Sequence, residues 1–311
     1  MKKILFAIII VVIIILSLFV ISKTNNQQKH NSQKIKIVTT IFPLFDFVRS
    51  IGQDKVEVSL LLPPGVEAHA FEPRPSDLVK INEADIFIYT GKFMEPWVDD
   101  IIKGVSNKKL KIIDSSLGIN MIASTINEGD KIPGLVDPHI WLDFDNDKII
   151  ADAILAALSE KDFVNADFYR NKELEYKNKL VKLDNRYQAT LSDCKKKEIV
   201  YGGHYAFGYL AHRYGLKYLA AQGVSPDSEP TAKDLILLVA QIKENNIKYV
   251  FYEELASPKI AEILAGETGT EMLLLNAAHN ITKNDFDNNL SFLDIMEGNL
   301  INLKIGLECN K

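Results

Sequence analysis

The 311-residue sequence has few of the features that mark several large functional classes. Its two cysteines, Cys194 and Cys309, are too few for a disulfide framework and lack the CxxC spacing of thiolate metal sites. A single bridge between them is compatible with an exported protein. The net charge is −5, with basic residues scattered among acidic ones, which argues against nucleic-acid binding. No HExxH, GxSxG or P-loop motif occurs, which disfavours metalloproteases, serine hydrolases and P-loop ATPases.

The amino terminus carries the clearest targeting signal. Lys2 and Lys3 precede an apolar run from Ile4 to Ile21 that only Ser17 interrupts. A charged start followed by a long apolar run predicts a membrane anchor or signal peptide over residues 1–22. We expect an uncleaved anchor, with the bulk of the chain outside the cytoplasm. No cysteine stands directly after the run, so we expect no lipid-modified cysteine anchor.

Residues 23–34 are polar and show no apolar periodicity. They are therefore expected to form a flexible tether. His30 lies in this segment and receives no functional role.

From residue 35 onward, strand and helix patterns alternate in both halves of the chain. This alternation predicts an α/β fold with two lobes, each a mostly parallel sheet flanked by helices. Strands are expected at 36–42, 56–62, 85–91, 110–114, 197–201, 218–221, 249–252 and 272–275. Helices are expected at 43–52, 76–84, 96–105, 206–214, 231–242, 258–264 and 286–307. Residues 117–136 resemble a loop.

The middle of the chain predicts one long helical stretch. Residues 145–192 contain no proline and carry dense charge, with a break expected near 162–165. A helix with so much charged surface is typical of a strut. We therefore divide the chain into an N-terminal lobe at 35–143, a linking helix at 144–192 and a C-terminal lobe at 193–311.

Three histidines are presented in similar ways: His69 and His204 follow predicted strands, and His139 follows Pro138, which fixes the backbone before it. Open α/β sheets place ligands at the carboxyl ends of their strands. Imidazole suits Zn²⁺ and related divalent ions, and separations of 70 and 65 residues exclude a local zinc finger. A metal site in the cleft between the lobes is therefore predicted. Asp137 or Asp143 is expected to hold the imidazole of His139 in one tautomer.

Two other histidines receive different interpretations. His212 lies within a predicted helix and is expected to be structural or on the surface. His279 follows the last predicted strand and is a candidate fourth ligand.

Three motifs carry a resemblance to a known family. They are GVEAHAFEP at 65–73, DPHIWLD at 137–143 and HYAFGYL at 204–210. The chain resembles the metal-binding receptors of zinc and manganese ABC importers, the cluster A-I or TroA-like solute-binding family, over nearly all of residues 35–308. The resemblance implies metal ligands at His69, His139 and His204. It also implies two lobes joined by a rigid helix, with limited hinge motion.

The resemblance further implies a function. We expect a monomeric extracytoplasmic receptor, not an enzyme, that captures Zn²⁺ and passes it to an ABC permease and its ATPase. The family commonly places a carboxylate ligand near the end of the last strand, where this sequence has Asn276. His279, Glu254 or a water molecule would then complete the site. The family's histidine-rich loop is missing, because residues 117–136 contain no histidine.

Three alternatives stay open. A nitrogen-rich ligand set favours Zn²⁺, but a Mn²⁺ receptor is the nearest competitor. A zinc hydrolase would use the open metal position to activate water, with Glu67, Glu72 or Glu254 as base. A surface adhesin is compatible with the resemblance as a secondary activity. For a histidine site, metal affinity is expected to fall as the pH drops through about 6.5.

Overall fold

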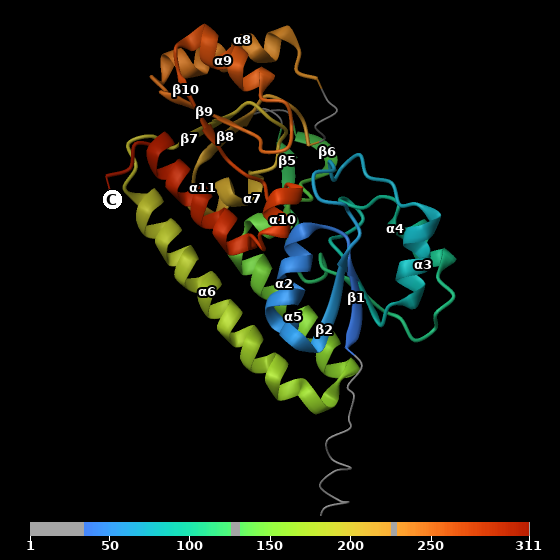
Figure 1. Cartoon of the computed structure of the whole chain (residues 1–311). Coiled ribbons are helices and arrows are strands. Elements are labelled where there is room, and N and C mark those ends of the chain that lie inside the picture. The colour runs from blue at the N-terminus through green and yellow to red at the C-terminus, as the bar shows by residue number, and fades with distance from the viewer. Residues whose placement is uncertain (1–33, 126–130, 225–228, 311) are drawn as a thin grey trace, which may run out of the picture. The chain divides into compact units, whose positions relative to one another are not determined.

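Figure 1 shows the computed structural model, which describes residues 34–125, 131–224 and 229–310. Residues 35–311 form one compact unit. The expected anchor at 1–22 and nearly all of the tether lie outside the described residues. Within the described ranges, no helix combines the length and the apolar character needed to span a bilayer.

The first four-stranded sheet is entirely parallel and has the order β2-β1-β3-β4. Its strands are β1 (Ile35–Thr39), β2 (Val56–Leu60), β3 (Ile86–Tyr89) and β4 (Lys111–Asp114). Its helices are α2 (Phe42–Gly52), α3 (Pro75–Glu83) and α4 (Val98–Gly104). Pro43 lies in the first turn of α2, where its missing N–H costs nothing. This arrangement confirms the expected α/β pattern in the first half of the chain.

The second sheet repeats the design with the order β10-β9-β7-β8, again with parallel pairs. Its strands are β7 (Glu198–Tyr201), β8 (Lys217–Ala220), β9 (Tyr249–Tyr252) and β10 (Glu271–Leu274). The flanking helices are α7 (Gly208–Tyr214), α8 (Ala232–Glu244) and α9 (Lys259–Thr268). A reciprocal capping box between Thr231 and Asp234 starts α8, at the beginning of the helix expected over 231–242.

Two expectations need correction. The segment expected to be a loop at 117–136 contains an antiparallel strand pair, β5 (Ala123–Thr125) and β6 (Lys131–Val136). The expected final helix at 286–307 is two helices, α10 (Lys283–Asp287) and α11 (Phe292–Gly306). A new helix begins because Ser291 and Asp294 form a capping box, and Asn289 before it has a left-handed φ of 58°.

The expected linking helix is a helical hairpin. Helices α5 (Phe144–Lys161) and α6 (Ala166–Ser192) are joined by the 3₁₀ turn Phe163–Asn165, at the break expected from the sequence. The two helices pack on each other, and the rings of Phe144 and Tyr187 meet edge to face at 5.4 Å. The long helix is therefore α6 alone. The division at residues 143 and 192 stays a prediction.

Helix α2 connects the two halves of the chain. The ring of Phe47 contacts Phe292 of α11 at 5.1 Å between centroids and Tyr176 of α6 at 5.4 Å. The buried carboxylate of Asp46 accepts a hydrogen bond of 2.9 Å from the backbone N–H of Phe292. One continuous core therefore links the first sheet to the last helix.

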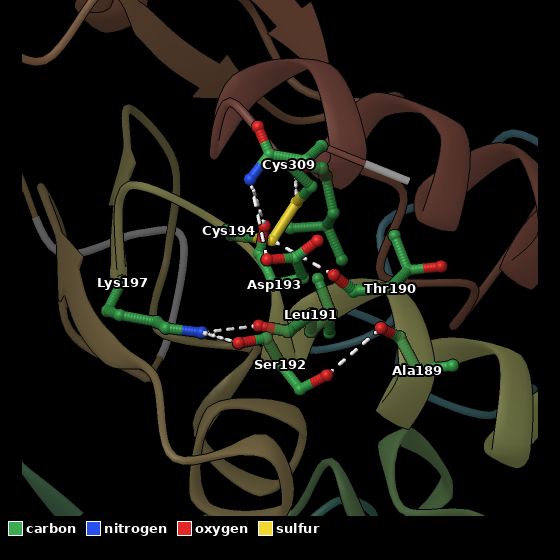
Figure 2. Close-up of a disulfide and its surroundings, with 10 residues drawn as sticks. Ala189, Thr190, Leu191, Ser192, Asp193, Cys194, Lys197 and Cys309 are labelled. Atoms are coloured by element: carbon green, nitrogen blue, oxygen red, sulfur yellow. Dashed lines mark hydrogen bonds between the residues drawn. A yellow bond between two sulfur atoms is a disulfide. The ribbon is translucent and has the colours of Figure 1, made fainter.

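A disulfide joins Cys194 and Cys309 and ties the end of α6 to the end of the chain (Figure 2). The two cysteines also form an antiparallel bridge, and the Lys196 N–H donates to the Leu307 carbonyl at 3.0 Å. Lys197 donates to the last carbonyls of α6, those of Leu191 and Ser192, at 2.5 and 3.1 Å. The bridge considered from the sequence is therefore present in the structure.

Cys309→Ser is expected to lower the free energy of unfolding by about 2–4 kcal/mol, because the bridge closes a long loop and restricts the unfolded chain. Urea denaturation of residues 23–311 measures the change. Reducing agent should shift the parent to the midpoint of the variant and leave the variant unmoved. Equal urea midpoints for the parent and the variant in the absence of reducing agent would contradict a stabilising bridge.

Candidate metal centre

Three loops bring the predicted histidines together. His69 lies in the loop after β2, His139 starts the 3₁₀ turn Ile140–Leu142 after β6, and His204 follows β7. Gly203 makes the last position possible, because a Cβ there would lie 2.6 Å from the Glu253 carboxylate. The strand-end rule applied to the sequence therefore selected residues that meet in space.

The three imidazoles point their Nε2 atoms at one another. Nε2 of His139 lies 3.2 Å from Nε2 of His69 and 3.2 Å from Nε2 of His204. Tetrahedral zinc with bonds of 2.0–2.1 Å requires ligand nitrogens about 3.3–3.4 Å apart. His139 and His204 are fully buried, and His69 is half-buried. The spacing therefore fits a small tetrahedral cation at the centre.

Two carboxylates orient the buried imidazoles. Asp137 Oδ1 lies 2.7 Å from Nδ1 of His139 and also accepts the His139 backbone N–H at 3.0 Å. Glu253, directly after β9, lies 2.9 Å from Nδ1 of His204. A carboxylate that accepts the Nδ1 proton leaves the Nε2 lone pair available for a metal. Both lone pairs therefore face the same central point.

This arrangement decides between the two expected partners of His139. Asp137 holds the imidazole, whereas Asp143 accepts the Asp145 N–H at the start of α5. Sequence reasoning missed Glu253 as a partner of His204. Its position directly after a buried strand was the available signal.

The site favours neutral imidazoles. Burial, and then the charges of neighbouring histidines, holds the pKa values of His69 and His139 well below the ordinary value. Burial also raises the pKa of Asp137 to about 8. Burial acts to raise the pKa of Glu253, but the hydrogen bond and charge of His204 keep it below its usual value. A bound cation would therefore meet unprotonated imidazole nitrogens at His69 and His139.

His279, which follows β10, lies beside the three histidines. Its ring centroid is 5.5 Å from that of His204 and 6.1 Å from that of His69. The side chain is fully buried, yet neither ring nitrogen has a hydrogen-bond partner among the described residues. His204, Glu253 and His279 also form a second group whose ligand atoms lie within 4.8 Å of one another.

Three carboxylates surround His279 at slightly longer range. Its Nε2 lies 3.7 Å from Glu67 and 4.0 Å from Glu253, and its Nδ1 lies 3.8 Å from Glu254. Burial lowers the pKa of His279, but these carboxylates outweigh burial and raise it to about 9. The free site therefore carries one protonated imidazole at neutral pH.

The other sequence candidates have different roles. The Asn276 side chain accepts the Ala278 N–H at 2.7 Å, so it serves a backbone turn. One oxygen of Glu254 accepts the Ala277 N–H at 3.2 Å, and the other has no hydrogen-bond partner among the described residues. His212 is exposed on α7, as expected, and His30 lies outside the described residues.

Helix α7 connects the His139 segment with the His204 segment. It begins at Gly208, where a Cβ would collide with the Asp137 carboxylate. Near its end, Arg213 binds Asp184 of α6 through two nitrogens at 2.9 and 2.5 Å. The same guanidinium donates to Asp143 at 2.6 Å and to Asp145 at 2.8 Å. Both ends of α7 therefore fix the loop that carries His139.

An open groove of about 640 Å³ leads to the half-buried ligand candidate, His69. The rings of Phe71 and Trp97 meet edge to face on its wall, with centroids 6.1 Å apart. Glu72 and Asp100 add two carboxylates to the lining. The groove therefore gives the cluster access to solvent on the His69 side.

A comparison with known families decides the classification. The profile of the zinc-uptake complex component A family, ZnuA, described as periplasmic, matches residues 37–306. The chain belongs to this family. The matched range contains all four clustered histidines of this chain.

Individual relatives agree with this assignment. The high-affinity zinc uptake system protein ZnuA of Bacillus subtilis (strain 168) is 35% identical over 291 residues, 91% of each chain. The zinc-binding lipoprotein AdcA of Streptococcus pneumoniae is 35% identical over 292 residues, 90% of this chain but 57% of AdcA. The Zn(II)-bound ZnuA-like domain of AdcA aligns with a TM-score of 0.76 and 34% identity, covering 89% of this chain and 100% of the domain.

One further relative is itself described as having two activities. The laminin-binding protein Lmb of Streptococcus agalactiae aligns with a TM-score of 0.79 and 28% identity, covering 88% of this chain and all of Lmb. It is described as bifunctional, with adhesin and metal-transporting activity. These relatives are described as metal-binding or metal-transporting proteins rather than enzymes.

Replacing an orienting carboxyl group by an amide is expected to weaken metal binding. Glu253→Gln and Asp137→Asn should each lower the affinity for a divalent metal about 10–100-fold, because the Nδ1 partner sets tautomer and basicity. Competition with a chromogenic chelator measures this. The matched control is Glu72→Gln, which removes an exposed carboxylate from the groove. Equal losses in all three variants would contradict the orienting role.

Proposed function

We propose that this protein is the extracytoplasmic substrate-binding component of an ABC importer, which captures Zn²⁺ and delivers it to the membrane permease and its ATPase. The observation that carries the proposal is the convergence of three Nε2 atoms with neighbouring separations of 3.2 Å. Membership of the zinc-uptake family supports the choice of cargo.

We infer that His279 completes the ligand set with His69, His139 and His204. It is a fully buried imidazole with no hydrogen-bond partner in the described part of the chain, and it packs against the ring of His204. In the free protein a proton balances the three nearby carboxylates, and in the loaded protein Zn²⁺ takes over that role. Asn276 is not part of the proposed set, because its amide oxygen accepts a hydrogen bond from the backbone N–H of Ala278.

The ligand chemistry separates the candidate cargoes. Four imidazoles form a borderline nitrogen set that suits Zn²⁺, whereas Mn²⁺ prefers carboxylate, carbonyl and water oxygens. The hydrolase alternative requires a base beside a metal-bound water. Glu67 already accepts the backbone N–H of His69 at 2.8 Å, and Glu72 is an exposed residue of the groove. A receptor that holds its cargo is therefore the better match.

We propose that the protein works as a monomer outside the cytoplasmic membrane, attached through residues 1–22. The disulfide supports an oxidising compartment, since such bonds persist in exported proteins. The half-buried position of His69 beside the groove makes this side the path for metal entry and release. Limited hinge motion of the two sheets about α6 stays part of the proposal.

Calorimetric titration of chelator-stripped residues 23–311 tests the cargo and the ligands. One tight Zn²⁺ site and far weaker Mn²⁺ binding are expected. His139→Ala should abolish tight binding, because it removes the central nitrogen, and His279→Ala should reduce affinity partially. His212→Ala, which truncates an exposed histidine, is the control and should bind normally. A parent protein without a tight divalent site would overturn the proposal.

The pKa shifts revise the expected pH dependence. The lowered pKa values of His69 and His139 keep both unprotonated below pH 6.5, so their protonation weakens binding only in more acidic solution. His279, with its pKa of about 9, should instead release close to one proton per Zn²⁺ bound at pH 7.5.

Titration in two buffers of different ionisation enthalpy counts the protons released. His279→Ala should release about one proton fewer than the parent at the same pH. A parent protein that releases no proton would show that His279 keeps its proton, and the fourth ligand would then be Glu254 or water.

A further inference from the structure

The most exposed large apolar side chains among the described residues are adjacent in the chain. Phe163 is 84% exposed and Val164 is 91% exposed, followed by Leu117 at 72%. Phe163 and Val164 lie in the 3₁₀ turn between α5 and α6, which we call the hairpin tip (Phe163–Asn165). The hydrophobic effect disfavours leaving such a pair in water, so the hairpin tip is a candidate contact surface.

The hairpin tip has a defined shape. One oxygen of Asp162 accepts hydrogen bonds from the Asn165 amide at 2.6 Å and from the Tyr169 hydroxyl at 2.8 Å. The Asp162 N–H also closes the end of α5 on the Leu158 carbonyl at 2.9 Å. The two apolar side chains are thus presented on a hydrogen-bonded turn.

The hairpin tip lies at the end of the molecule where the described chain begins (Figure 1). The Lys36 N–H and the Lys111 N–H both bind Asp85, at the start of the first sheet. The Lys111 ammonium then pairs with Glu160 at 2.6 Å, three residues before Phe163. Contacts therefore run from the first residues of β1 to the last turn of α5.

The membrane is within reach of this end. The apolar run from Ile4 to Ile21 precedes a tether of residues 23–34. Twelve residues span at most about 40 Å even when fully extended. If the proposed anchor is in the bilayer, Ile35 and the amino ends of the strands stay within that distance of the membrane.

Positive charge next to the hairpin tip favours contact with an anionic surface. Lys161 donates to the Lys109 backbone carbonyl at 2.5 Å, so the Lys161 ammonium lies against the segment that carries Lys108 and Lys109. None of these three forms an ion pair with a carboxylate of the described residues. Glu160 is already paired with Lys111. Apolar side chains flanked by lysines are typical of segments that bind anionic lipid surfaces.

We propose that the hairpin tip docks on the anionic face of the membrane as a second attachment beside the amino-terminal segment. This inference rests on the anchor in the proposed function. A single weak attachment gains strength when a second contact is tethered nearby. The histidine cluster lies at the carboxyl ends of the strands, so docking turns the metal site away from the bilayer and towards incoming metal. Delivery then requires release of the hairpin tip.

Site-specific fluorescence on the full chain in vesicles tests the docking. Both native cysteines are in the disulfide, so Phe163→Cys provides one reactive thiol for an environment-sensitive dye. In vesicles that contain phosphatidylglycerol, the dye at 163 should shift to the blue and be quenched by brominated acyl chains. Leu117→Cys, which labels an exposed apolar position on another loop, is the matched control and should show neither change.

A dye at 163 that behaves like the dye at 117 overturns the proposal, and so does a shift that is unchanged in purely zwitterionic vesicles. Lys109→Gln with Lys161→Gln should reduce the shift at 163. Tight Zn²⁺ binding by the labelled protein is measured in parallel. It reports on the proposed function independently, so a failed docking and a failed receptor assignment are distinguishable.

Discussion

The structure of the site depends on two hydrogen bonds between carboxylates and imidazoles. Asp137 and Glu253 occupy the Nδ1 sides of His139 and His204, and both Nε2 lone pairs then face one point. Two lone pairs 3.2 Å apart repel each other unless a proton or a cation lies between them. Since burial opposes protonation of His139, the free site is poised for a metal ion. His69 approaches the same point from another loop, and the ring of His279 lies beside the cluster, 5.5 Å from that of His204 between centroids.

The contacts of α7 hold the residues of these hydrogen bonds in place. Arg213 joins α7 to α6 and to the segment after His139, and Gly208 allows α7 to contact Asp137. Because α7 is held at both ends, His139 and His204 form the fixed part of the site. His69 lines the groove and is the half-buried member of the cluster. Two buried imidazoles and one accessible imidazole would suit a receptor that must bind its cargo tightly and still release it.

The sequence predicted the alternating α/β fold and the three central histidines, because both follow from local patterns and from the strand-end rule. It could not predict Glu253, since the contact with His204 depends on β9 lying beside β7, and strand order is a long-range property. The hairpin at 123–136 was missed because its pairing rests on backbone hydrogen bonds, for which the short segments give little side-chain pattern. The burial of His279 among three carboxylates likewise depends on tertiary packing.

The most direct test of the central claim is a crystal structure of the zinc-loaded protein with diffraction data on both sides of the zinc absorption edge. The account predicts one strong anomalous peak, about 2.0–2.1 Å from Nε2 of His69, His139 and His204, with His279 as the fourth ligand. A peak outside this cluster, or a zinc ion that leaves Nε2 of His139 uncoordinated, would contradict it.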